Sequence, residues 1–331
     1  MSDLTAVANQ AELQPLLELT QSAGSDPLLT QASTGNSSAK LGGVLWIKAS
    51  AKWMADAMRD DIFIPLDLAE VMECLRHGVD PAGRFPSASL ETAMHATLPH
   101  RVVLHVHCVN TIAWAVRNDA PIQLAGHLEG LRWRWIPYVA SGLPLAKEIQ
   151  RALSAGCDQD VFVLGNHGLV VGGEDVRAVE NLLAEVTRRL AIAPRRAHPA
   201  DYASLLEIAG DSPWDLPDDD AIHALGTYPT SQSILAGGLL YPCQAIFFDP
   251  GTPDLNRCCD RPFRIVQGRG VVVSRSITPA ELAMLSGLAQ VVQRISASAP
   301  LRYLTEAELA GISSQAVFRY RELASQGGNG R

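Results

Sequence analysis

The first feature that could do chemistry is a pair of histidines one residue apart, His105 and His107. They belong to the stretch Arg101–His107, whose alternating pattern predicts a strand. Side chains at positions i and i+2 of a strand point to the same face, so both imidazoles would project to one side. Two neutral imidazoles side by side suit a divalent transition metal at about 2.0–2.1 Å from each nitrogen. Taken alone, the pattern also fits two ordinary, partly buried histidines.

A third histidine, His167, lies in the turn-forming sequence Gly165-Asn166-His167-Gly168. This sequence joins two apolar runs, Val161–Leu164 and Leu169–Val171, which predict a hairpin or tight strand connection because glycine tolerates the positive φ that such turns need. Taken alone, His167 is compatible with a solvent-exposed turn residue. Three such histidines with an open fourth position describe a catalytic rather than a structural zinc site.

Glu91 is a carboxylate that could serve such a site. It ends the sequence Pro86-Ser87-Ala88-Ser89-Leu90-Glu91, at the start of a helix predicted over residues 88–98. A carboxylate at that position also interacts favourably with the helix dipole, which requires no function. The functional alternative is a general base placed beside the metal.

The elements that must position these residues follow from the patterning of residues 1–195. The sequence predicts a short helix around Leu13–Leu19, a strand over Val44–Lys48, and helices over about 51–58, 66–76, 88–98, 111–116 and 175–190. We therefore expect an α/β fold over residues 1–195, with three layers in the order α/β/α. The sheet is expected to be mixed or antiparallel, because a strand carrying two histidines beside a histidine hairpin implies antiparallel pairs.

The rest of the chain is predicted to form a linker and a smaller C-terminal α/β extension. Residues 196–222 have the proline content and acidic run of a linker, and the extension is expected over residues 223–331. Strands are predicted near 245–248, 263–266 and 271–274, and a helix over 279–295. Residues 265–273 echo residues 163–171, with Arg269 in place of His167, which suggests a degenerate half-repeat without a metal-binding role.

The overall composition narrows the classes of function. The chain has 331 residues and a formal net charge of −8, which argues against a nucleic-acid-binding surface. No apolar run approaches the roughly 18–20 residues needed to cross a bilayer, and the first residues lack the pattern of a signal peptide. Six cysteines without a C-x-x-C motif favour a reduced, cytoplasmic protein. We expect a small-molecule substrate and neither a nucleic acid nor a membrane as partner.

Several motifs together resemble the class II aldolase/adducin family of zinc-dependent sugar-phosphate aldolases and epimerases. They are Gly35–Lys40, Leu45–Ala51, the pair Glu91 and His95, the pair His105 and His107, and the turn at 165–168. The two earliest stretches look most like the aldolase part of bifunctional rhamnulose-phosphate aldolase/dehydrogenase proteins. The similarity covers residues 30–195 well and residues 235–297 loosely.

The resemblance implies a role for individual residues of this chain. His105, His107 and His167 would bind a catalytic zinc ion or another divalent transition metal. Glu91 would be the catalytic acid/base. The positions that match the family's phosphate-binding residues are Asn36, Ser38, Ser50 and Ser89. One departure is that the family's Ser-Gly is Ser50-Ala51 here, which stiffens a loop expected to approach a phosphate.

The activity implied by the resemblance is that of a zinc-dependent lyase. Such an aldolase would cleave or form a carbon–carbon bond in a ketose, ketose phosphate or sugar acid through a metal-stabilised enediolate. Epimerase, dehydratase and decarboxylase activities share the same metal site and stay open. A non-catalytic adducin-like interaction module is a further alternative, although that branch of the family has lost the metal ligands.

The resemblance further implies a homo-oligomer, a tetramer, with active sites near subunit boundaries. In the segment 132–138, Trp133, Trp135 and Tyr138 are interleaved with arginines, a composition enriched at interfaces. We interpret this segment as a lid or a subunit contact. A stacking platform for nucleic acid is disfavoured by the net negative charge.

Overall fold

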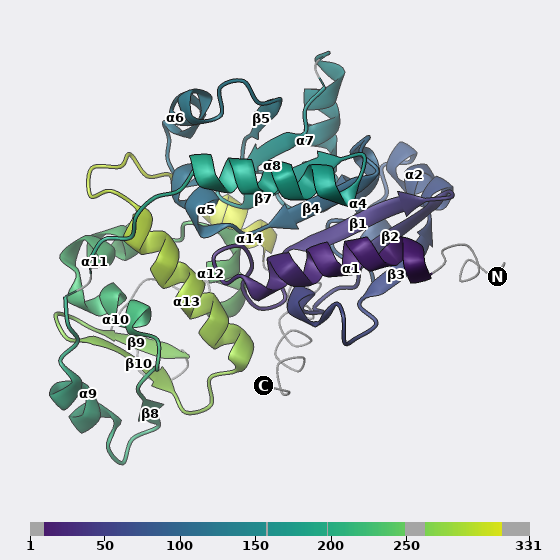
Figure 1. Cartoon of the computed structure of the whole chain (residues 1–331). Helices are drawn as coiled ribbons and strands as arrows, with labels where there is room; N and C mark the ends of the chain where they lie inside the picture. Colours follow the sequence, from purple (N-terminus) through teal and green to yellow (C-terminus); the bar gives the residue numbers. More distant parts are fainter. Residues whose placement is uncertain (1–9, 157, 197, 249–261, 313–331) are drawn as a thin grey trace.

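A seven-stranded sheet forms the centre of the N-terminal half of the chain (Figure 1). The computed structural model describes residues 10–156, 158–196, 198–248 and 262–312. The strands are β1 (Asn36–Leu41), β2 (Val44–Lys48), β3 (Phe63–Asp67), β4 (Val102–Val106), β5 (Trp133–Ile136), β6 (Val161–Leu164) and β7 (Gly168–Gly173). Their order in space is β3-β2-β1-β4-β7-β6-β5, and only the β5–β6 pair is parallel.

Helices cover both faces of this sheet, because successive side chains of a strand point to opposite faces. The helices of this half are α1 (Gln10–Ser25), α2 (Leu68–Arg76), α3 (Pro81–Arg84), α4 (Thr92–Thr97), α5 (Val109–Ala115), α6 (Ala120–His127), α7 (Leu143–Ser154) and α8 (Val176–Arg189). Leu104 of β4 shares a buried cluster with residues of α1 and α8, which lie together on one face in Figure 1. Val103 shares another with residues of α4 and α7. The predicted α/β class with a largely antiparallel sheet is confirmed.

The C-terminal part contains a three-stranded antiparallel sheet in the order β8-β10-β9. Its elements are α9 (Tyr202–Ala209), β8 (Trp214–Asp215), α10 (Asp220–Thr227), α11 (Pro229–Ala236), α12 (Pro242–Phe248), β9 (Phe263–Val266), β10 (Gly270–Ser274), α13 (Pro279–Arg294) and α14 (Glu306–Ile312). Helix α13 packs against α5, and Ile112 of α5 shares a buried cluster with Leu285 and Leu288 of α13. The two parts therefore have a common hydrophobic core. Within the described ranges, no helix is both long and apolar enough to cross a bilayer.

The strand predicted near residues 245–248 is wrong, because these residues belong to helix α12. Pro242 occupies the first helical position, where its missing N–H costs nothing. Cys243 and Phe247 are four residues apart and both buried, which is a helical spacing. An apolar run of this length does not distinguish a strand from a short buried helix.

The predicted linker at 196–222 contains α9, β8 and the beginning of α10. Its acidic residues include two helix caps. The Asp201 carboxylate accepts a hydrogen bond from the Ser204 backbone N–H at 3.2 Å, and the Asp219 carboxylate accepts one from the Ala221 N–H at 2.8 Å. Acidic residues that suggest a loop by composition thus start helices by satisfying free backbone donors.

Helix boundaries also differ from the sequence prediction. The helix predicted over 51–58 is a single 3-10 turn, Met54–Asp56. Helix α1 runs to Ser25 with Pro15 inside it, longer than the short helix expected around Leu13–Leu19. Helix α4 begins at Thr92, so Glu91 lies at the N-cap position.

Candidate active site

Three imidazoles converge where β4 ends and β7 begins. His105 lies in β4 opposite Val170 of β7, His107 follows the last residue of β4, and His167 directly precedes β7. One ring nitrogen from each of the three lies within 4.8 Å of the others. All three side chains are buried. The structure therefore brings together the three histidines that the sequence singles out.

The backbone of the turn allows this convergence. Asn166 adopts a φ of +49°, the left-handed region that asparagine tolerates better than most residues. A Cβ added to Gly168 would lie 2.6 Å from the Val106 carbonyl oxygen and 3.3 Å from the His105 ring. Glycine is required at position 168 because the turn passes so close to β4.

The hydrogen bond made by His105 leaves its Nε2 atom available as a ligand. His105 Nδ1 lies 3.0 Å from the Leu169 carbonyl oxygen. Because a carbonyl only accepts, Nδ1 carries the hydrogen and Nε2 has a free lone pair. His107 Nε2 lies 3.1 Å from His105 Nε2. Burial lowers the pKa of His167 to about 4, so its ring is neutral near pH 7. Three ring nitrogens placed this close together fit a divalent transition metal such as zinc.

Glu91 faces the imidazoles and does not cap helix α4 with its side chain. Its Oε2 lies 3.3 Å from His105 Nε2, and its Oε1 lies 3.4 Å from His167 Nε2. Asn36 Nδ2 donates to Oε2 at 2.9 Å, and the Ser141 hydroxyl donates to Oε1 at 3.2 Å. Burial raises the pKa of the carboxyl, but the nearby imidazoles and Asn36 outweigh this effect and hold the pKa below its usual range.

A buried chain of hydrogen bonds holds the oxygen of the Asn36 amide. Its Oδ1 is bonded to His95 Nε2, and His95 Nδ1 lies 2.7 Å from the Ser38 hydroxyl. Since Asn36 Oδ1 can only accept, His95 Nε2 is the donor and Nδ1 accepts from Ser38. Burial lowers the pKa of His95 to about 3, so the ring stays neutral. This chain orients the Asn36 amide so that its Nδ2 points to Glu91.

A cavity of about 90 Å³ adjoins His107, His167 and Glu91. Asn36, Ser50 and Ser89, three of the predicted phosphate-binding residues, are part of its lining. The fourth, Ser38, is bonded to His95 and is not part of that lining. Ala51 has a φ of +61°, so this position adopts the conformation that favours glycine, the residue in the family's pattern.

Lys48 is a lining residue that the sequence reasoning missed. It ends the apolar strand β2 and is fully buried, although lysine is almost never buried without partners. Its ammonium donates to the carbonyl oxygens of Ser33 and Lys52 at 3.2 and 2.6 Å. Burial lowers its pKa to about 7, and the Glu91 carboxylate opposes this shift. Its place two residues before Ser50, at the end of an apolar run, was the available signal.

Ser141 and Cys243 were also missed. Ser141 lies in the loop before α7, and Cys243 lies in α12 of the C-terminal part. Cys243 Sγ is 3.3 Å from His107 Nδ1. Burial, with a contribution from Glu91, raises the pKa of the Cys243 thiol to about 12. No local pattern in the sequence marks either residue.

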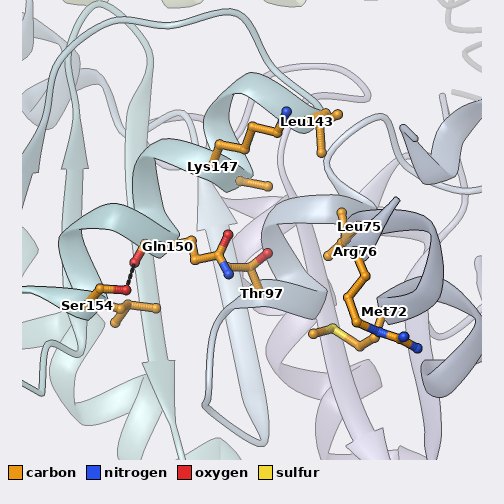
Figure 2. A pocket seen from close by; sticks show the side chains of 10 residues that line it. Met72, Leu75, Arg76, Thr97, Leu143, Lys147, Gln150 and Ser154 are labelled. Atoms are coloured by element: carbon orange, nitrogen blue, oxygen red, sulfur yellow. Dashed lines mark hydrogen bonds between the residues drawn. The ribbon is translucent and has the colours of Figure 1, made fainter. Parts of the chain in front are cut away.

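A larger hollow of about 360 Å³ lies between α2 and α7 (Figure 2). Figure 2 shows Arg76 and Met72 of α2 on one side and Lys147 and Gln150 of α7 on the other. Its ten lining residues include no carboxylate, thiol or imidazole. The histidine cavity has all three kinds of group in its lining and is therefore the candidate active site.

The comparisons with known proteins identify the family of this chain. Residues 14–193 match the family model of the Class II Aldolase and Adducin N-terminal domain. The chain belongs to the class II aldolase and adducin family, and the family predicted from the motifs is confirmed.

Individual relatives share only part of the chain. The "Uncharacterized oxidoreductase YuxG" of Bacillus subtilis (strain 168) is 28% identical over 144 residues, which are 40% of this chain and 21% of that protein. The chain thus spans about a fifth of the length of this curated relative. The N-terminal class II aldolase domain of a conserved protein from Thermoplasma acidophilum is 23% identical, with a TM-score of 0.48 over 55% of this chain and 93% of that one. The L-fuculose-1-phosphate aldolase from Thermus thermophilus is 15% identical, with a TM-score of 0.39 over 60% of this chain and 98% of that one.

Proposed function

We propose that this chain is a zinc-dependent aldolase, which cleaves or forms a carbon–carbon bond in a ketose, ketose phosphate or sugar acid. Membership of the class II aldolase and adducin family supports an aldolase-type lyase. The observation that carries the proposal is the convergence of three buried imidazoles on one carboxylate beside a cavity.

His105, His107 and His167 are the residues that hold the ion. Bound zinc supplies a Lewis acid that polarises a substrate oxygen. Glu91 is the acid/base, because its carboxylate lines the cavity and lies next to two of the three imidazoles. Hydrogen bonds from Asn36 and Ser141 fix the carboxylate, so that a proton can be taken from or returned to the substrate in one geometry.

The polar wall of the cavity is suited to an anionic end of the substrate. Asn36, Ser50 and Ser89 offer amide and hydroxyl groups, and Lys48 offers a buried ammonium. A phosphate or carboxylate bound there could accept hydrogen bonds from the amide and hydroxyl groups and would be attracted by the charge of the ammonium, whose own three donors are directed to backbone carbonyl oxygens. Ser38 acts in this proposal through His95 and Asn36, and not by contact with the substrate.

The test is a zinc measurement on purified protein followed by a substrate screen with aldehyde-release detection. We expect about one zinc ion per chain and release of an aldehyde from at least one ketose or ketose phosphate. Zinc without aldehyde release, but with epimerised, dehydrated or decarboxylated product, would assign one of the related activities. Absence of zinc from metal-replete protein would favour an adducin-like interaction module.

We further propose that the chain forms a homo-oligomer, a tetramer. β5 lies at the edge of the seven-stranded sheet and carries Trp133 and Trp135, both only partly buried in one chain. A sheet edge with two accessible indoles is a surface that association would cover. Light scattering at micromolar concentration tests this, and a mass near 35.5 kDa would contradict it.

A cytoplasmic location is part of the same proposal. Cys74, Cys108 and Cys243 are free thiols, as expected for a reducing compartment. Fractionation of cells that produce the protein tests it, and recovery outside the cytoplasmic fraction would contradict it.

A further inference from the structure

The C-terminal part of the chain contributes one wall of the candidate active site. Pro242, Cys243 and Ile246, at the beginning of α12, line the same cavity as His107 and His167. Nothing in the proposed roles of the histidines, Glu91 or the polar wall requires these residues. They lie in the same lining as two of the three imidazoles, where they can influence the histidine side chains.

The C-terminal part is hydrogen-bonded directly to the turn that carries His167. Asn166 Nδ2 donates to the carbonyl oxygens of Leu240 and Arg302, each at 2.8 Å. Asn166 Oδ1 accepts from the Arg302 guanidinium at 2.9 Å. Every polar atom of this fully buried amide therefore binds the C-terminal part.

The beginning of the segment between Leu240 and Cys243 is also held by a side chain of α12. Gln244 Oε1 accepts from the backbone N–H groups of Leu240 and Tyr241, at 2.6 and 3.3 Å. Leu240, three residues before Cys243, is thus held by the buried side chains of both Asn166 and Gln244. The start of α12 is fixed in this way next to His107, and the Cys243 thiol lies 3.3 Å from His107 Nδ1.

We propose that Cys243 is a positioning residue for the metal site, whose thiol holds the His107 imidazole in the orientation and tautomer that can bind a metal. The inference rests on the proposed function of the histidines. The contact that carries it is the 3.3 Å separation of Cys243 Sγ and His107 Nδ1, with both side chains buried. His105 has a corresponding partner, the Leu169 carbonyl oxygen on its Nδ1.

A thiol suits this role because it both donates and accepts a hydrogen bond. When His107 Nε2 coordinates a metal, the ring hydrogen is on Nδ1 and the sulfur accepts it. Without a metal, His107 Nε2 can donate to His105 Nε2, and Nδ1 then accepts from the S–H. The same side chain therefore satisfies Nδ1 in both states.

The alternative is that Cys243 only fills space. Two substitutions separate these roles. Cys243→Ser keeps a group that donates and accepts, whereas Cys243→Val keeps an apolar side chain of similar bulk without a partner for Nδ1. Cys108→Val is the matched control, because Cys108 directly follows His107 and, like Cys243, is buried in a hydrophobic cluster.

The experiment measures the zinc dissociation constant of each full-length variant by competition with a chromophoric chelator. We expect Cys243→Val to weaken zinc binding by about 10–100-fold, the usual effect of losing a hydrogen-bond partner of a metal ligand. Cys243→Ser should stay within about threefold of the wild type, and Cys108→Val should not change the constant. The visible spectrum of the cobalt-substituted protein should shift for Cys243→Val and not for Cys108→Val.

The outcomes discriminate between this inference and the function on which it rests. Equal zinc affinity in wild type and Cys243→Val overturns the inference but leaves the metal site intact. Equal losses in Cys243→Val and Cys108→Val, or a loss in Cys243→Ser as large as in Cys243→Val, indicate packing and also overturn it. Wild-type protein that binds no zinc overturns the proposed function itself, and the inference with it.

Discussion

Two hairpins of this chain have the same strand register and different chemistry. β6 pairs with β7 so that Val161 is opposite Val171 and Leu164 is opposite Gly168. β9 pairs with β10 so that Phe263 is opposite Val273 and Val266 is opposite Gly270, the same register 102 positions later. Each hairpin is followed by a long helix, α8 or α13.

The agreement extends to the hydrogen bonds of the turns. The Asn166 N–H donates to the carbonyl oxygen of Ala115 at the end of α5, at 3.0 Å. The Gly268 N–H likewise donates to Gly226 in α10, at 2.9 Å. Both turn residues have positive φ, 49° and 72°. This supports the interpretation of residues 223–331 as a degenerate half-repeat, which, like the domain limits, stays a prediction.

The difference lies in what surrounds the two turns. The turn with His167 is buried next to β4, which brings His105, and is covered by the C-terminal part. The turn with Arg269 is exposed, and its neighbouring strand β8 has two residues, Trp214 and Asp215. The hairpin is thus a generic support, and the proposed metal site depends on the neighbouring strand.

The sharpest test of this comparison replaces His167 in the first turn and Arg269 in the second turn with alanine. His167→Ala should lower zinc affinity more than about 100-fold, since it removes a ligand and not merely a partner of a ligand. Arg269→Ala should leave zinc affinity and melting temperature unchanged. Zinc titration and thermal melting of both variants provide the measurement. Retention of full zinc affinity by His167→Ala would remove the chemical distinction between the turns.

The carboxylates near the two tips provide the second test. Glu91→Gln should lower turnover by about 10²-fold or more while largely retaining zinc, because glutamine keeps the size of the side chain and loses its basicity. Asp201→Asn, near Arg269, should leave turnover unchanged, since asparagine also caps a helix well. Turnover and zinc content are measured side by side. Normal turnover in Glu91→Gln would show that the proton is moved by another group.

The third test gives the first turn the residue of the second. Asn166→Gly keeps the positive φ but removes three buried hydrogen bonds, one of them from a guanidinium. We expect a loss of about 3 kcal/mol in the free energy of unfolding. Denaturant unfolding measures this loss. A loss below about 0.5 kcal/mol would mean that the three hydrogen bonds of the Asn166 side chain contribute little to stability.

The reverse exchange has the smallest expected effect. Gly268→Asn places asparagine at a φ of +72°, in open space, where no atom would lie within 4 Å of its Cβ. Asparagine tolerates the left-handed region, so the change in unfolding free energy should be within about 1 kcal/mol. A much larger loss in the same unfolding experiment would show that the second turn is constrained by contacts of its own.

Much of the fold and part of the site could be predicted from local patterns. The alternation along β4 places His105 correctly, because the period of a strand is local, and the glycines at 165 and 168 indicate the turn. Residues 245–248 were assigned wrongly because a short apolar run has no distinctive period. Lys48 had a local signal, a lysine at the end of an apolar run, but Ser141 and Cys243 could not be assigned, since their roles depend on side chains that only the tertiary fold brings near.

The bond between Asn166 and Arg302 has a consequence for the order in which the protein is made. Its two ends are 136 residues apart in sequence, and so are Cys243 and His107. Chains emerge from the ribosome at about 5–20 residues per second, so these partners follow their targets by roughly 7–27 seconds. The strands carrying the histidines can pair during that interval, but Asn166 gains its hydrogen bond to Leu240 only after residue 240, and its two to Arg302 only after residue 302, has been synthesised. These contacts of the C-terminal part with the candidate site therefore form only after the strands that carry the histidines have been synthesised.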